Sequence, residues 1–146
     1  MLFKLSTLDT GNAPAGTVTT LPRVSSFSPS LASKDSYRER NDGVNIRRER
    51  GRRLMECKLV VEVLDTEVQA LFQVLGNASL RTGTPLFLWW DIGTIATPSY
   101  PAIWLKPSGT WFSRFYCWIE NPRLDSSSGK WFKISFGAKS AWENTT

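Results

Sequence analysis

The stretch that decides the fold runs from Cys57 to Gly76 and reads CKLVVEV followed by LDTEVQALFQVLG. In its first part an apolar residue stands at every second position, with Leu59, Val61 and Val63 following Cys57. Alternate side chains of a strand point to opposite faces, so this period of two predicts a β-strand with one buried face.

The second part of the stretch predicts a helix of about three turns. Its apolar residues recur at i, i+3, i+4 and i+7, namely Val68, Leu71, Phe72 and Leu75. Asp65 is the predicted N-cap, and Glu67 is expected in the first turn near the positive end of the helix dipole. Gly76 or Asn77 is expected to end the helix in a left-handed cap. The apolar stripe predicts packing on a sheet.

Four further strands are predicted after the helix. They lie at Leu86–Trp90, Ala102–Leu105, Trp111–Glu120 and Trp131–Ala138. The segments Ile92–Pro101 and Asn121–Gly129 between them are predicted loops. This order predicts a mainly β protein with one helix, an antiparallel β-sandwich or half-open barrel with the helix against it.

The N-terminal third has a different composition. Residues 1–45 are rich in Ser, Thr, Gly and Pro, and we expect an extended or irregular N-terminal arm that is mobile or held by partners. Its short apolar pieces, Leu2–Leu5 and Val18–Val24, are either short strands or docking points. Residues 46–146 are expected to form a single β-rich domain. The piece Val44–Arg53 either pairs with the strand at Cys57–Val63 through Gly51 or is a charged loop.

Most of the excess positive charge lies in one segment. Between Lys34 and Arg53 there are 8 Lys or Arg and 4 Asp or Glu, against a net charge of +5 for the chain. Such a block suits a polyanion or an acidic patch on a partner subunit, and the alternative is a solvated segment of mixed charge. The candidate subunit-interface residues are Arg47, Arg48, Arg50, Arg52 and Arg53.

All seven Trp lie between Trp89 and Trp142, so the second half is expected to hold most of the core. Trp89 and Trp90 are consecutive on a predicted strand, so one of them must point inward. The candidate exposed aromatic residues are Trp90, Tyr100 and Trp111. Exposed aromatic rings of this kind stack on sugars, which keeps a carbohydrate-binding module open as an alternative function.

The chain contains no His, which removes Ser-His-Asp and Cys-His nucleophiles and His-based metal sites. No phosphate-binding, dinucleotide-binding or calcium-loop motif is present. We therefore expect no enzyme, no catalytic residues, no cofactor and no metal. Cys57 and Cys117 form no CxxC pair and are expected to be reduced, buried thiols. The N-terminus has no apolar signal-peptide core and no stretch is long enough for a membrane span, so we expect a soluble protein with no membrane partner.

Four pieces of the chain together resemble a known family. These are the amphipathic strand Cys57–Val63, the helix Val68–Leu75, the glycine turn and aromatic run Gly83–Trp90, and the alternating aromatic segment Trp131–Trp142. In this order, over residues 44–142, the chain resembles the minor tail protein M and distal tail protein group of long-tailed bacteriophages.

The resemblance implies a tail-tube-like fold, with copies arranged as a homo-hexameric ring around a central channel. It also implies a structural role near the junction of the tube with the tip or baseplate, in contact with other virion tail proteins. The implied location is the virion tail, with assembly in the host cytoplasm. DNA would be contacted only in the lumen. A basic nucleic-acid-binding protein, indicated by the sequence pI of about 9.5, is the other alternative.

Overall fold

The computed structural model describes residues 2–32, 36–48, 54–126 and 129–142. Within them the chain is mainly β with a single helix, α1 (Val68–Ser79). The strands are β1 (Leu2–Thr10), β2 (Ala13–Leu21), β3 (Val24–Ala32), β4 (Ser36–Glu39), β5 (Asn45–Arg48), β6 (Leu54–Leu64), β7 (Leu86–Asp91), β8 (Trp104–Leu105), β9 (Trp111–Phe112), β10 (Arg114–Ser126) and β11 (Trp131–Ser140). The predicted fold class is confirmed.

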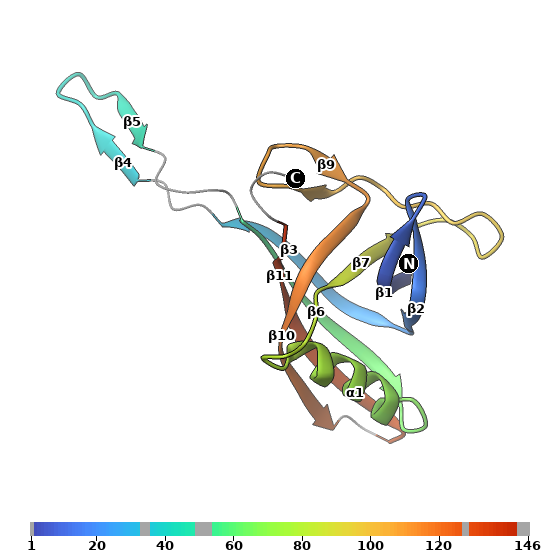
Figure 1. The fold of residues 1–146 in the computed structure, drawn as a ribbon. Helices are drawn as coiled ribbons and strands as arrows, with labels where there is room; N and C mark the ends of the chain where they lie inside the picture. Colours follow the sequence, from blue (N-terminus) through green and yellow to red (C-terminus); the bar gives the residue numbers. More distant parts are fainter. Residues whose placement is uncertain (1, 33–35, 49–53, 127–128, 143–146) are drawn as a thin grey trace.

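Seven strands form one antiparallel sheet in the order β2-β1-β7-β10-β11-β6-β3, which is not closed into a barrel. The two edge strands, β2 and β3, are nevertheless consecutive in the chain and are joined only by Pro22 and Arg23. Three peptide steps span at most about 11 Å, so the end of β2 and the start of β3 lie close together. The sheet must therefore curl strongly, as Figure 1 shows.

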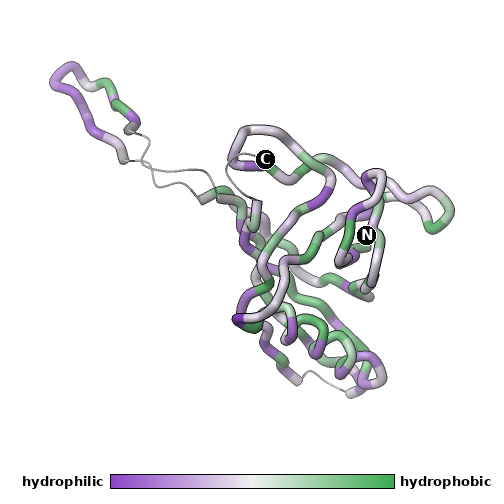
Figure 2. Tube along the Cα trace, viewed as in Figure 1, coloured by the Kyte–Doolittle hydropathy of each residue, from purple (hydrophilic) through white to green (hydrophobic). Residues whose placement is uncertain are grey.

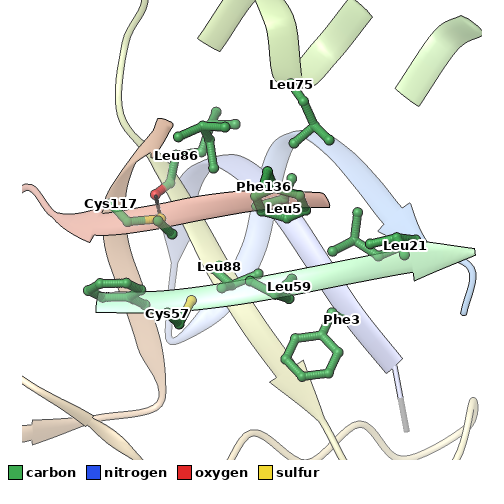
Figure 3. Close-up of a cluster of buried hydrophobic side chains, with 14 of the residues drawn as sticks. Phe3, Leu5, Leu21, Cys57, Leu59, Leu75, Leu86, Leu88, Cys117 and Phe136 are labelled. Atoms are coloured by element: carbon green, nitrogen blue, oxygen red, sulfur yellow. Dashed lines mark hydrogen bonds between the residues drawn. The ribbon is translucent and has the colours of Figure 1, made fainter. Parts of the chain in front are cut away.

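The register of the sheet gathers the core on one face. Cross-strand partners share a face, and Leu59 of β6 lies opposite both Phe136 of β11 and Phe27 of β3. On the other half of the sheet, Leu88 of β7 lies opposite both Leu5 of β1 and Phe115 of β10. Except for Phe27, which is half-buried, these side chains are almost fully buried. Many of them meet in the cluster of Figure 3.

Helix α1 packs against β10 and β11 and contributes Leu71, Leu75 and Ala78 to the core. The predicted Asp65 N-cap is wrong, because the N-cap position is Glu67 and it makes no side-chain capping hydrogen bond. A turn comes first, closed by the Glu67 N–H donating to the Leu64 carbonyl at 3.0 Å. The predicted end at Gly76 or Asn77 is also wrong, since the helix continues to Ser79.

The expectation of irregular structure across residues 1–45 is wrong for Leu2–Ala32. This segment forms β1, β2 and β3, and β1 lies inside the sheet between β2 and β7. Phe3 and Leu5 of β1 are almost fully buried. Most Ser and Thr residues of the segment lie on exposed positions or edge strands, which explains its polar composition.

The predicted loop at Asn121–Gly129 is wrong up to Ser126. Strand β10 continues through this segment, and Arg123–Ser126 pair with Phe132–Ser135 of β11. The register shifts between Glu120 and Arg123, and Asn121 has a positive φ of 48°. A β-bulge therefore replaces the expected loop, and its Asn-Pro sequence is what suggested a break in the strand.

The basic segment forms a hairpin of its own. β5 pairs with β4, with Tyr37 opposite Arg47 and Arg38 opposite Ile46. Neither alternative for Val44–Arg53 therefore holds over Asn45–Arg48, which neither pairs with Cys57–Val63 nor forms a loop. The partners of the Cys57–Val63 strand are instead β3 and β11. In Figure 1 the hairpin β4–β5 projects away from the curled sheet.

Consecutive residues of β6 point to opposite faces of the sheet, and this gives a stability test with a matched control. Replacing buried Leu59 with Ala should lower the free energy of unfolding by about 2–5 kcal/mol through lost burial and a residual cavity. Replacing its exposed neighbour Lys58 with Ala should change it by less than about 0.5 kcal/mol. Urea unfolding followed by Trp fluorescence measures both values, and equal effects would contradict the assigned face.

Candidate functional site

The predicted basic interface lies partly on the projecting hairpin. Arg47 is exposed on β5 and Arg48 ends that strand, whereas Arg50, Arg52 and Arg53 lie outside the described residues. Two further arginines, Arg38 and Arg40, lie on or beside β4 and are exposed. The structure thus places basic residues of both strands on one hairpin, which the sequence could indicate only as a run of charge.

Apolar side chains are exposed on the same hairpin. Tyr37 is 68% exposed and Ile46 is 46% exposed. The turn between the strands is well formed, because the Arg40 N–H donates to the Val44 carbonyl at 2.8 Å and Gly43 adopts a φ of 82°. Exposed apolar residues beside arginines are typical of protein interfaces. We name this surface, Tyr37–Arg47, the hairpin surface.

The three candidate exposed aromatic residues do not form one platform. Trp90 is half-buried on the core side, with ring centroids 6.3 Å from Phe3 and 5.9 Å from Phe27. Tyr100 is half-buried against Trp89, which points to the opposite face of β7. Only Trp111, on β9, is well exposed, at 54%. A sugar-stacking surface made of all three is therefore not assembled.

Trp89 is fully buried although it lies on the outer face of the sheet. Tyr100 covers it, with ring centroids 5.0 Å apart, and the Trp89 indole N–H donates to Ser6 Oγ at 2.9 Å. The segment that follows β7 therefore folds back over the outer face. This anchors residues 92–103 to the sheet.

Asp91 organises the start of this segment. Its carboxylate is almost fully buried and accepts hydrogen bonds on Oδ1 from the Gly93 N–H at 2.9 Å and the Ser99 N–H at 3.1 Å. Lys4 Nζ lies 3.7 Å from the other oxygen of Asp91. Ile92 N–H also donates to the Ser99 carbonyl at 2.9 Å, so the loop is closed at its base.

The tip of this loop presents apolar side chains to solvent. Ile95 is 96% exposed and Ile92 is 53% exposed. The turn is held by Thr97, whose N–H donates to Thr94 Oγ1 at 3.1 Å. Sequence reasoning missed this surface, although the uncharged, Pro-containing run of residues 92–103 was visible in the sequence.

Two cationic side chains near β9 lie over an aromatic ring, and one of them also pairs with an acid. Lys106 Nζ lies 4.0 Å from the centroid of the Phe112 ring, and Arg114 lies over the same ring at 5.0 Å. Arg114 also forms an ion pair with Asp9 and donates to Asn12 Oδ1 at 3.2 Å. Burial, together with the charge of Arg114, lowers the pKa of Lys106. These contacts tie the β8–β9 region to the β1–β2 turn.

Two carboxylates of the sheet, on β6 and β10, lie close to the same lysine. Glu56 and Glu120 lie on either side of Lys139, whose Nζ is 3.9 Å and 3.8 Å from their carboxylates. The three surround a hollow of about 280 Å³ on the outer face, over Gly137. The lysine between the carboxylates makes this an ion-pair network.

Within the described ranges, no group of three His, Cys, Asp or Glu side chains is placed to hold a metal ion. No helix in the same part of the chain is long and apolar enough to cross a membrane.

Cys57 and Cys117 are both buried and free, as expected. Burial raises the pKa of Cys57 to about 12. The pKa of Cys117 is raised well above its ordinary value by burial and by its neighbour Cys57. Cys117 donates to the Leu86 carbonyl, a contact drawn in Figure 3. The thiols are part of the core.

The comparisons with known proteins leave the function to be argued from the structure. No protein-family model matches the chain, and the search of curated proteins found no match.

The Asp91 carboxylate gives a test of the loop. Asp91→Ala removes the acceptor for both loop N–H groups, so thermolysin should cleave at the Thr94–Ile95 bond at least tenfold faster. Asp91→Asn keeps an oxygen at the Oδ1 position and should stay close to the parent rate. Cleavage of Asp91→Ala at the parent rate would show that Asp91 does not hold the loop.

The raised pKa values predict that both thiols stay protonated and unreactive in the folded protein at pH 8. A chromogenic disulfide reagent should react with neither until denaturant is added, and then with both. Ser108→Cys, at an exposed turn, should add one thiol that reacts at once. Rapid reaction of Cys57 or Cys117 before unfolding would contradict the assigned core.

Proposed function

We propose that this chain is a structural subunit of a bacteriophage tail that forms a ring around the channel near the tube–tip or baseplate junction and joins neighbouring tail proteins. The observation that carries the proposal is the projecting hairpin β4–β5, which extends from a curled sheet braced by one helix (Figure 1). A rigid body with a reaching element suits a subunit whose partners lie on more than one side.

The hairpin surface is better suited to a protein partner than to solvent. An isolated two-stranded hairpin is only marginally stable in water, and this one exposes Tyr37, Val44 and Ile46. Figure 2 shows both hydrophobic and hydrophilic stretches along the hairpin. Contact with a neighbour would bury the apolar side chains and order the strands.

The charge of the hairpin surface indicates the chemistry of that partner. Arg38, Arg40 and Arg47 outnumber Glu39 and Asp42, and Asp42 already pairs with Arg40 at 3.2 Å. An acidic patch on an adjacent tail protein complements this surface. Complementary charges speed and orient association. Binding between the hairpin surface and its partner should therefore weaken as salt is added. A contact with DNA in the lumen would use the same arginines.

Ring formation needs a contact between unlike surfaces of identical subunits, repeated about a rotation axis. The chain presents more than one candidate surface for this, because the hairpin surface and the loop at Ile95 project from different parts of the sheet (Figure 1). The proposed assembly is a homo-hexameric ring located in the virion tail.

The test of this function is negative-stain electron microscopy of the purified protein at high concentration, with the mass measured by light scattering. Closed rings with a central hole and a mass near six subunits are expected. Only monomers, both alone and with the neighbouring tail proteins of the same phage, would overturn the proposal. Quenching of Trp fluorescence by soluble glycans in such monomers would instead favour a carbohydrate-binding module.

A double substitution tests the hairpin surface. Tyr37→Ala with Ile46→Asp should reduce binding to neighbouring tail proteins at least tenfold while leaving the melting temperature unchanged, because the hairpin projects from the core. Leu124→Asp, which replaces a similarly exposed apolar residue on β10, is the matched control and should bind normally. Pull-down and thermal unfolding measure the two effects, and loss of binding in both variants would argue against a specific hairpin contact.

A further inference from the structure

The loop after β7 carries an apolar knob. Ile95 at its tip is 96% exposed, and residues 92–103 contain no charged residue. In Figure 1 this loop projects beyond β7 and the β1–β2 hairpin, and Figure 2 shows its tip as a hydrophobic patch. An isoleucine held almost wholly in water by a rigid loop is positioned for a contact with another molecule.

The knob is preorganised. The buried Asp91 carboxylate holds the base of the loop, and the hydroxyls of Thr94 and Thr97 are 2.8 Å apart across its turn. Gly93 leaves no room for a side chain, since an added Cβ would lie 2.2 Å from the Thr97 carbonyl oxygen. Little conformational freedom remains to be lost on binding, which favours affinity.

An apolar groove of about 480 Å³ lies between β2 and α1. Thr20 and Pro22 line one side, and Ala70, Leu71 and Val74 line the other, with Glu67 at the helix start. Most of the lining is methyl and methylene surface, and the described part of the chain leaves the groove open. It can receive a branched aliphatic side chain without burying a pair of charges.

We propose that Ile95 of one copy of this chain docks into the β2–α1 groove of the next copy. A second copy is the fitting occupant because the chain carries both halves of the contact, a rigid apolar knob and an open apolar groove. Copies with a net charge of +5 repel one another, so their contact is best made through surfaces with few charges. The knob loop has none, and the groove has only Glu67, whose negative charge suits a basic neighbour.

The contact joins unlike surfaces, so it leads from copy to copy and either closes into a ring or continues as a filament. The inference rests on the proposed function in one respect, namely that copies of this chain associate. It adds the residues that form the contact.

Site-directed cross-linking tests the pairing. Full-length Ile95→Cys and Ala70→Cys variants are mixed at high concentration and oxidised with copper phenanthroline, and a cross-linked dimer is expected in the mixture. Each variant oxidised alone should give at least tenfold less dimer, because the proposed contact does not bring two copies of the same residue together. The native Cys57 and Cys117 are buried and give little background. A mixture of Ile95→Cys with Ser108→Cys, an exposed position in the turn between β8 and β9, is the matched control.

The outcomes separate this contact from the ring itself. Rings in the micrographs without an Ile95–Ala70 cross-link would overturn the knob-and-groove contact and leave the proposed function standing. Equal cross-linking of Ile95→Cys with itself, or with Ser108→Cys, would also overturn it. No association of the parent protein by light scattering, either alone or with the neighbouring tail proteins, would overturn both. As an independent measurement, Ile95→Asp should lower the association constant at least tenfold with an unchanged melting temperature, whereas Leu80→Asp, at another exposed apolar position, should not.

Discussion

The rest of the structure depends on the two-residue connection between β2 and β3. It forces the edges of a seven-stranded sheet toward each other, and Phe27 of β3 then packs against rings from the opposite half of the sheet, Phe3 and Trp90. The connection is fixed by Arg23, whose carbonyl accepts from the Glu62 N–H at 2.7 Å and whose guanidinium pairs with the Glu62 carboxylate at 3.3 Å. Curling turns a single sheet into an enclosure with one core.

This enclosure frees the outer face and the strand ends for contacts. The core takes up large apolar residues of α1 and of seven strands, namely β1, β2, β6, β7, β8, β10 and β11, so the elements that extend beyond it are not needed for burial. The hairpin β4–β5 and the Ile95 loop both extend beyond the core. Hydrogen bonds within its own turn stabilise each of them. Repeated assembly of identical subunits requires a stable body with preorganised projections. Binding then loses little conformational entropy.

Cooperation between distant segments explains where sequence reasoning failed. Leu2–Leu5 contains only two residues that become buried, too few to predict a strand from the sequence. β1 is nevertheless an interior strand, because β2 and β7 supply partners on both sides. The break expected at Asn121-Pro122 became a bulge because β11 pairs on both sides of it. The Ile95 surface was missed since an uncharged loop of Ile, Thr and Pro has no pattern that distinguishes a buried loop from an exposed knob.

The sequence by itself determined the mainly β class, the strand at Cys57–Val63, the helix stripe at Val68–Leu75 and the buried thiols. These follow from local periodicity and from the burial of apolar residues, which each segment carries in its own side chains. Only the tertiary structure decided the strand order, the hairpin pairing of the basic segment and the separation of Trp90 from Tyr100. These depend on which segments meet across the sheet, and a pairing between distant strands is set by the packing of the whole chain.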